Sequence, residues 1–334
     1  MCNRGRAPLV EEEDIARAPE GVHDALLLLA EISDTAHATS LALSLGARPG
    51  VAWAEVWVEA PCPIPLRPEP PGSMPTVTLS CVGSSSIPPN DAAAALHGIV
   101  CAVQDKGVVA MLGSMRSSQV ERLKRGAHER IRVFEEALAS KHSHLVGGTS
   151  QFAFIEVGSR GDHRFDLLFD PLDSCIEGTD ENWIPIVARL LGSSFNRAVS
   201  VVYSDPGAPD QPWHADGQHL GPDAGWAPDG VPSPPYALCV FVPLVDLDAR
   251  MGFTQFWKGS HAQSQLVGFG EACAVLGQNA DGIVRRGDAV LYDYRTLHRG
   301  MKNESCLRRP LVQYLYSVPS YAEVRNYGKD SLFS

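Results

Sequence analysis

The chain has 334 residues, 44% of them hydrophobic, so it can bury the core of one large domain with extensions or of two small domains. Its formal net charge of −11 argues against a nucleic-acid partner, because binding to phosphate depends on clustered lysines and arginines. The eight cysteines form no C-x-x-C pair, which argues against a zinc ribbon and favours free thiols in a reducing compartment. The first residues lack the apolar core of a signal peptide, and no apolar run has membrane-spanning length. We therefore expect a cytoplasmic protein without membrane contact.

The first 90 residues differ from the rest in composition and in the pattern of their apolar residues. Residues 22–30 place apolar side chains at the spacing of one helical face, and residues 61–89 are rich in proline, which disfavours helix. We expect residues 1–90 to form an N-terminal extension of unknown role, and residues 91–334 to form the main domain.

Within the main domain, helical support is expected over residues 91–140 and a β-rich core over about 150–320. The helices should span residues 91–105 and 117–139, with a strand at 108–112 between them. Short β-rich runs, separated by Gly, Pro and Asp, follow at 199–203, 236–244, 252–257, 289–294 and 311–318. Recurrent short strands with little helical pattern between them predict a mainly β sandwich or barrel with flanking helices.

A metal site is predicted around His214 and Asp216. Residues two apart in a strand point to the same face, so this imidazole and this carboxylate can converge on one ion. The strand-like segment 287–298 ends in His298, which can supply a third ligand. Two histidines and one carboxylate leave positions open on the metal, as in non-heme iron(II) oxygenases.

Arg308 and Arg309 follow the segment 287–298 and carry positive charges that do not titrate near neutral pH. Arg309 opens the β-rich run before Val318 and can bind a dicarboxylate in bidentate fashion. Its neighbour Arg308 would point to the opposite side of a strand, so only one of the two can serve this role. We favour Arg309.

From about Asp91 to Val318 the chain resembles the phytanoyl-CoA dioxygenase (PhyH-like) family of Fe(II)- and 2-oxoglutarate-dependent oxygenases. One departure is Lys258, which stands where the family's Pro-Gly-Ser-His turn has its usual proline. The resemblance rests on Gly107–Leu112 with the helix at Ser117, His214-Ala-Asp216, Phe241–Asp246 with Gly252, Trp257–His261, Gly287-Asp288, His298-Arg-Gly300, Asn303 and Arg309-Pro310.

The resemblance implies a double-stranded β-helix, which is a cupin-like jelly roll with helices on its outer face. It implies that His214, Asp216 and His298 hold Fe(II), that Arg309 holds 2-oxoglutarate, and that O2 is the second co-substrate. The reaction would oxidise an unactivated C–H bond of a small organic molecule and form succinate and CO2. Halogenating relatives replace the carboxylate by Ala or Gly, so Asp216 favours hydroxylation or a related oxidation.

Four further residues are candidates for the pocket. Tyr203 could donate a hydrogen bond to 2-oxoglutarate or substrate, Arg164 could meet an anionic substrate, and Trp213 and Trp226 could line the cavity. We expect no catalytic residue beyond the metal ligands.

Three alternatives compete with this interpretation: a catalytically silent jelly-roll binding protein, a hydroxylase of protein side chains, and a metal enzyme that does not use 2-oxoglutarate. A binding module has no chemical need for the three ligands and the arginine, and Arg309 with Asn303 and Pro310 argues against the last. Because fold does not determine function, substrate, reaction outcome and oligomeric state stay open at this stage.

Overall fold

The computed structural model describes residues 73–79, 89–146, 151–217, 234–263, 266, 269–270, 272–323 and 326–334. The helix expected over residues 22–30 and the candidate Trp226 lie outside these ranges. None of the helices within them is both long and apolar enough to cross a membrane.

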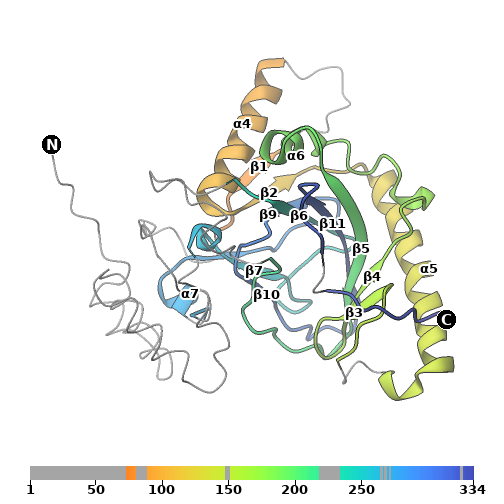
Figure 1. Ribbon diagram of the computed structural model, residues 1–334. Coiled ribbons are helices and arrows are strands. Elements are labelled where there is room, and N and C mark those ends of the chain that lie inside the picture. Colours follow the sequence, from red (N-terminus) through yellow and green to blue (C-terminus); the bar gives the residue numbers. More distant parts are fainter. Residues whose placement is uncertain are drawn as a thin grey trace.

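Two β-sheets form the centre of the molecule (Figure 1). All strand pairs are antiparallel except β1 with β2, which are parallel. The larger sheet contains, in spatial order, β1 (Thr76–Thr78), β2 (Val108–Leu112), β9 (Ala289–Asp293), β6 (Ala237–Pro243), β11 (Arg309–Ser317), β5 (Asn196–Ser204), β4 (Arg164–Leu168) and β3 (Val157–Ser159). The smaller sheet contains β10 (His298–Gly300), β7 (Thr254–Trp257) and β8 (Asn279–Asp281).

From β5 onward the chain winds between the two sheets. It leaves β5 in the larger sheet, reaches His214, which bridges to His298 of the smaller sheet, and returns to the larger sheet as β6. Strands β7 and β8 lie in the smaller sheet, β9 in the larger, β10 in the smaller and β11 in the larger. This winding is a double-stranded β-helix, so the predicted jelly-roll fold is confirmed.

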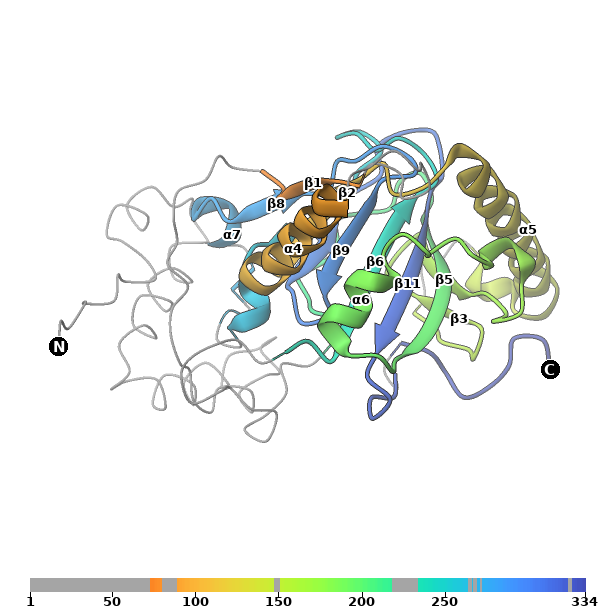
Figure 2. The same ribbon diagram turned by 90° about the horizontal axis from the view of Figure 1, so that it is seen from above.

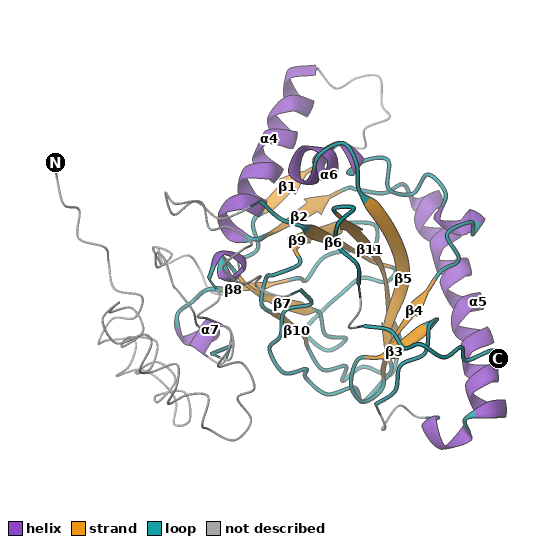
Figure 3. Ribbon diagram, in the orientation of Figure 1, coloured by secondary structure: helices purple, strands orange, loops and turns teal. Residues whose placement is uncertain are grey.

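Helices cover the outer face of the larger sheet (Figures 2 and 3). In α5 (Ser117–Lys141) the buried side chains recur every three to four residues, as expected for a helix with one apolar face. They pack on outward-facing strand residues such as Val240 and Val312, while Phe241 and Tyr292 face the space between the sheets. Helices α4 (Pro89–Lys106) and α6 (Ile184–Leu191) also lie against this sheet, and the short α7 (Ala272–Val275) completes the α-helices of the described residues.

The two helices predicted in the main domain, the strand predicted at 108–112 and the five predicted β runs all correspond to elements of the structure, with bounds shifted by a few residues. The sequence pattern did not predict the helices α6 and α7, the strands β3 and β4, or the short strands β1, β8 and β10. Strand β1 lies before residue 90 yet pairs with β2, so this part of the expected extension belongs to the sheet of the main domain.

The segment ending in His298 differs from the prediction. Residues 287–298 do not form one strand: β9 ends at Asp293, a turn follows in which Thr296 N–H donates to Asp293 O at 2.8 Å, and β10 begins at His298. The turn carries the chain to the other sheet. That crossing brings His298 beside His214.

Candidate active site

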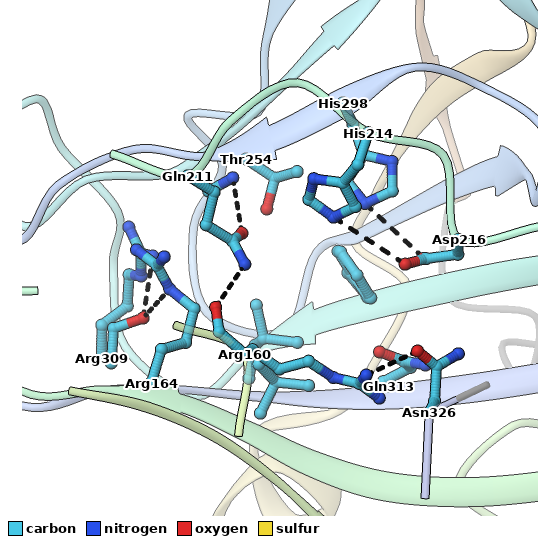
Figure 4. Close-up of a pocket in the computed structure, with 15 residues that line it drawn as sticks. Arg160, Arg164, Gln211, His214, Asp216, Thr254, His298, Arg309, Gln313 and Asn326 are labelled. Carbon is cyan, nitrogen blue, oxygen red and sulfur yellow. Dashed lines mark hydrogen bonds and ion pairs between the residues drawn. The ribbon is translucent and has the colours of Figure 1, made fainter. Parts of the chain in front are cut away.

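Three predicted metal ligands meet at the mouth of the space between the sheets. His214 and His298 are paired through their backbones, with N–O distances of 3.0 and 2.8 Å in the two directions. Asp216 follows two residues after His214 and turns its carboxylate toward both rings (Figure 4). One donor atom from each of the three residues lies within 4.8 Å of the others, close enough to hold one metal ion.

The hydrogen bonds of both imidazoles leave the same nitrogen free. Nδ1 of His214 lies 2.8 Å from Pro212 O, and Nδ1 of His298 lies 3.0 Å from Thr296 O. A carbonyl only accepts hydrogen bonds, so each Nδ1 carries the proton and each Nε2 keeps a lone pair. Both Nε2 atoms face Asp216, at 4.0 and 3.6 Å from its oxygens.

The charge state of the ligands suits a cation. Loss of hydration in the pocket and the proximity of His298 lower the pKa of His214 to about 4, so this imidazole is neutral at pH 7. Burial opposes ionisation of Asp216, but the two histidines, Arg160 and the Tyr292 hydroxyl outweigh it and lower its pKa. A neutral imidazole and an ionised carboxylate are the forms that bind metals.

Arg309 lies deep in the same pocket. Its Nη1 donates to Met251 O and Met301 O, and its Nη2 donates to Ser204 Oγ at 3.1 Å. Its Nε is buried and has no hydrogen-bond partner among the described residues. No described carboxylate forms an ion pair with this guanidinium, and burial followed by the charge of Arg164 lowers its pKa to about 9.

Arg308 points the other way. It forms ion pairs with Asp205 and with Glu135 on α5, and its guanidinium stacks 4.5 Å from the ring centroid of Tyr203. Of the two neighbouring arginines, only Arg309 faces the pocket.

Arg164 lies beside Arg309 because three strands are in register. Ser204 on β5 pairs with Arg164 on β4 and with Arg309 on β11, so the three residues form a row across the larger sheet. Ser204 Oγ accepts hydrogen bonds from Arg164 Nε at 2.8 Å and from Arg309. The two buried guanidinium groups carry two positive charges without an ion-pair partner among the described residues, which is a site for an anion.

The pocket that joins these groups has an empty volume of about 570 Å³, part of it open to solvent. Sequence analysis missed Ser204, Gln211, Thr254, Gln313 and Asn326, which line it together with Arg160. Gln211 fixes the segment before His214, since its amide accepts from Gly300 N–H and donates to Arg160 O. The apolar wall consists of Val202, Phe241 and Leu311.

Two predicted pocket residues face elsewhere. Tyr203 lies on the outer face of β5, buried against Phe165, because its neighbours Val202 and Ser204 take the inner face. Trp213 turns away from the pocket, packing near Trp257 and under the guanidinium of Arg299. Arg164 does line the pocket, at the end that holds Arg309.

Comparisons with known proteins identify the family of the chain. The sequence model of the phytanoyl-CoA dioxygenase family matches residues 97–310. Among solved structures, the chain is similar to AviO1 from Streptomyces viridochromogenes Tue57, with 19% identity and a TM-score of 0.48 over 68% of this chain and 96% of that chain. It is also similar to SnoN, a non-heme alpha ketoglutarate dependent epimerase from nogalamycin biosynthesis, with 17% identity and a TM-score of 0.45 over 71% of this chain and 96% of that chain. The non-heme monooxygenase ThoJ, in a nickel complex, has 16% identity and a TM-score of 0.44 over 70% of this chain and 85% of that chain.

The family match covers well over half of the chain and includes the two histidines, the aspartate and Arg309. The chain therefore belongs to the phytanoyl-CoA dioxygenase family of non-heme 2-oxoglutarate-dependent enzymes.

Proposed function

We propose that this protein is an Fe(II)- and 2-oxoglutarate-dependent oxygenase that oxidises an unactivated C–H bond of a small organic substrate, consuming O2 and forming succinate and CO2. The observation that carries the proposal is the pair of buried guanidinium groups, Arg309 and Arg164, in one pocket with the His214, Asp216 and His298 cluster.

The donor set fits iron(II). Two imidazole Nε2 atoms and one carboxylate oxygen converge from one side, which leaves coordination positions open toward the pocket. His214, Asp216 and His298 would hold the metal, with both rings kept in orientation by backbone carbonyls.

The arginine pair fits the distal carboxylate of 2-oxoglutarate. The unpaired Nε of Arg309 is a buried donor that needs an acceptor, and a bound carboxylate supplies one. Ser204 holds both guanidinium groups on the same side of the larger sheet.

Iron(II), when bound with 2-oxoglutarate and O2, supplies the oxidising chemistry. The chain's own residues bind and orient the reactants. Arg309, Arg164 and Ser204 anchor the co-substrate at one end of the pocket, and the apolar wall of Val202, Phe241 and Leu311 limits the access of water between that anchor and the metal ligands.

The decisive test is anaerobic addition of iron(II) and 2-oxoglutarate to the purified protein, followed by visible absorption of the chelate. We expect a band in the wild type and none in His298→Ala. Arg309→Ala should need roughly 30-fold or more 2-oxoglutarate for the same band, because truncation removes a buried charge partner. Arg308→Ala is the matched control, since its guanidinium forms ion pairs on the outer side, and it should titrate as the wild type does.

The absorption titration, together with a turnover assay in the presence of O2, separates the alternatives. A silent binding protein gives no band, and a metal enzyme that does not use 2-oxoglutarate binds iron without one. Succinate release that depends on a small molecule favours the proposal over a hydroxylase of protein side chains. No band in folded wild-type protein at saturating ligand would refute the proposal.

We also propose that the protein works in the cytoplasm. Cys175 and Cys239 are buried free thiols, which a reducing compartment preserves.

A further inference from the structure

The polar groups of the pocket fall into two sets (Figure 4). Arg309, Arg164 and Ser204 gather at one end, where the proposed function assigns them to 2-oxoglutarate. Arg160, Gln313 and Asn326 gather at the other side, below Asp216, and the proposed function gives them no role.

Arg160 is held by partners on three sides. Its Nε and Nη2 donate to Asp166 Oδ2, the latter at 2.6 Å, and its Nη1 donates to Asn326 Oδ1. The ring of Tyr327 lies 5.6 Å from the guanidinium. A guanidinium has five N–H groups, so three are used and two have no partner among the described residues. The charge of Arg160 is already balanced by Asp166.

Gln313 presents an unused amide. It lies on β11, on the same face as Arg309 and Leu311, and its half-buried side chain makes no hydrogen bond to a described residue. An amide of this kind offers an acceptor oxygen and two donor hydrogens to a ligand.

Asn326 comes from the C-terminal segment 326–334, outside the family match. Its Nδ2 donates to Tyr294 Oη at 2.9 Å, which fixes the side chain that in turn holds Arg160. The segment is tied to the domain where Gly328 N–H donates to Phe154 O and Leu332 N–H donates to Glu156. This end of the chain therefore helps to shape the pocket.

We infer that Arg160 and Gln313, with Asn326 as a positioning residue, select a neutral polar substrate that carries a carbonyl or hydroxyl oxygen; the inference rests on the proposed function. The free N–H groups of Arg160 donate to that oxygen, and the Gln313 amide binds an adjacent donor or acceptor. A carboxylate gains little from a guanidinium that Asp166 neutralises, and an ammonium group faces it unfavourably.

The test is ligand-observed saturation-transfer NMR on full-length protein loaded with zinc(II) and 2-oxoglutarate, a diamagnetic complex without turnover. The probes are lactamide, lactate and 1-amino-2-propanol, which are similar in size and differ in charge. We expect lactamide to receive much more saturation from the protein than lactate or 1-amino-2-propanol does. In Gln313→Leu the affinity for lactamide should fall by about three- to tenfold, the loss of one neutral hydrogen bond.

Gln151→Leu is the matched control, because Gln151 is exposed and lies outside the pocket, and it should bind lactamide as the wild type does. Asn326→Ala should lower the affinity for lactamide, because Arg160 loses the side chain that positions it. Asn326→Asp keeps an acceptor oxygen for Arg160 and should restore part of the lost affinity.

The 2-oxoglutarate signals in the same sample report the co-substrate site separately. If 2-oxoglutarate binds but lactate or the amine is preferred, or if Gln313→Leu binds lactamide like the wild type, the inference is overturned while the proposed function stands. If 2-oxoglutarate itself receives no saturation from the wild-type protein, the proposed function fails, and the inference fails with it.

Discussion

The Tyr292 hydroxyl on β9 donates a 2.8 Å hydrogen bond to Oδ2 of Asp216. Tyr292 is fully buried and reaches Asp216 from the larger sheet, whereas both histidines sit on the backbone ladder of the smaller one. The bond restrains one carboxylate oxygen and so orients the group toward the metal position.

Tyr292→Phe should therefore weaken metal binding by about 10- to 100-fold, as expected when a partner of a metal ligand is removed. Isothermal titration with an inert divalent ion such as zinc(II) measures this. Tyr314→Phe is the control, because Tyr314 lies in the core on the outer side of the larger sheet, where its hydroxyl contacts Thr179, and it should leave metal affinity unchanged. Equal affinities in Tyr292→Phe and wild type would show that the hydrogen bond has no orienting role.

Ser204→Ala should lower the affinity for 2-oxoglutarate by about three- to tenfold, since Ser204 Oγ is the acceptor shared by Arg164 and Arg309. The anaerobic visible titration measures the shift. Ser140→Ala, at an exposed site on α5, is the control and should titrate like the wild type. A Ser204→Ala titration identical to that of the wild type would mean that the arginines hold their positions without it.

Arg295→Met should destabilise the fold by about 3–5 kcal/mol at pH 7, because it leaves the buried Asp293 carboxylate without its 2.7 Å ion-pair partner. Burial opposes the ionisation of Asp293, but Arg295 overcomes it and lowers the pKa below 3.8. A lowered pKa contributes stability above the unfolded value, and that stability is lost as the pH falls through the folded value. Urea unfolding should show the difference between variant and wild type shrinking below about pH 4; a constant difference would contradict the assignment.

Gly158→Ala should destabilise the protein by about 1–3 kcal/mol, because an added Cβ would lie 2.5 Å from the backbone oxygen of Asn326 and force the C-terminal segment outward. Gly98→Ala is the matched control: its Cβ meets only Val77, at 3.9 Å, and the substitution in a helix should be neutral or stabilising by about 0.5–1 kcal/mol. Thermal unfolding compares the two. If the Gly158→Ala protein were as stable as the Gly98→Ala protein, the C-terminal segment would be able to move away from the added Cβ without loss of stability.

Local spacing and motif resemblance were sufficient to predict that His214, Asp216 and His298 lie together and that Arg309 faces the pocket. His214 and Asp216 are two residues apart, and alternation places both on one side. The same alternation decides between Arg308 and Arg309. Applied to β5 it excludes Tyr203 in favour of Ser204, but the sequence did not show which face of β5 is inner, because apolar residues occur on both faces of the run 199–203.

The substrate side could not be predicted from spacing. Arg160, Gln313 and Asn326 meet only through strand register and the path of the C-terminal segment, contacts that join residues far apart in the chain. Strands β3 and β4 were missed because Gly158, Gly161 and Asp162 interrupt the apolar pattern between them, and α6 because it has only eight residues.

Strand β11 is hydrogen-bonded on both edges, to β5 and β6, and carries Arg309, Leu311 and Gln313 on one face. Four residues of extended backbone span about 13 Å. The strand therefore sets the separation between Arg309, proposed to anchor the co-substrate, and the Gln313 amide, proposed to meet the substrate. This separation is fixed, because β5 and β6 are hydrogen-bonded to the two edges of β11. A longer or bulkier substrate would then require a change in the C-terminal segment 326–334. Such a change leaves the spacing of Arg309 and Gln313 along β11 as it is.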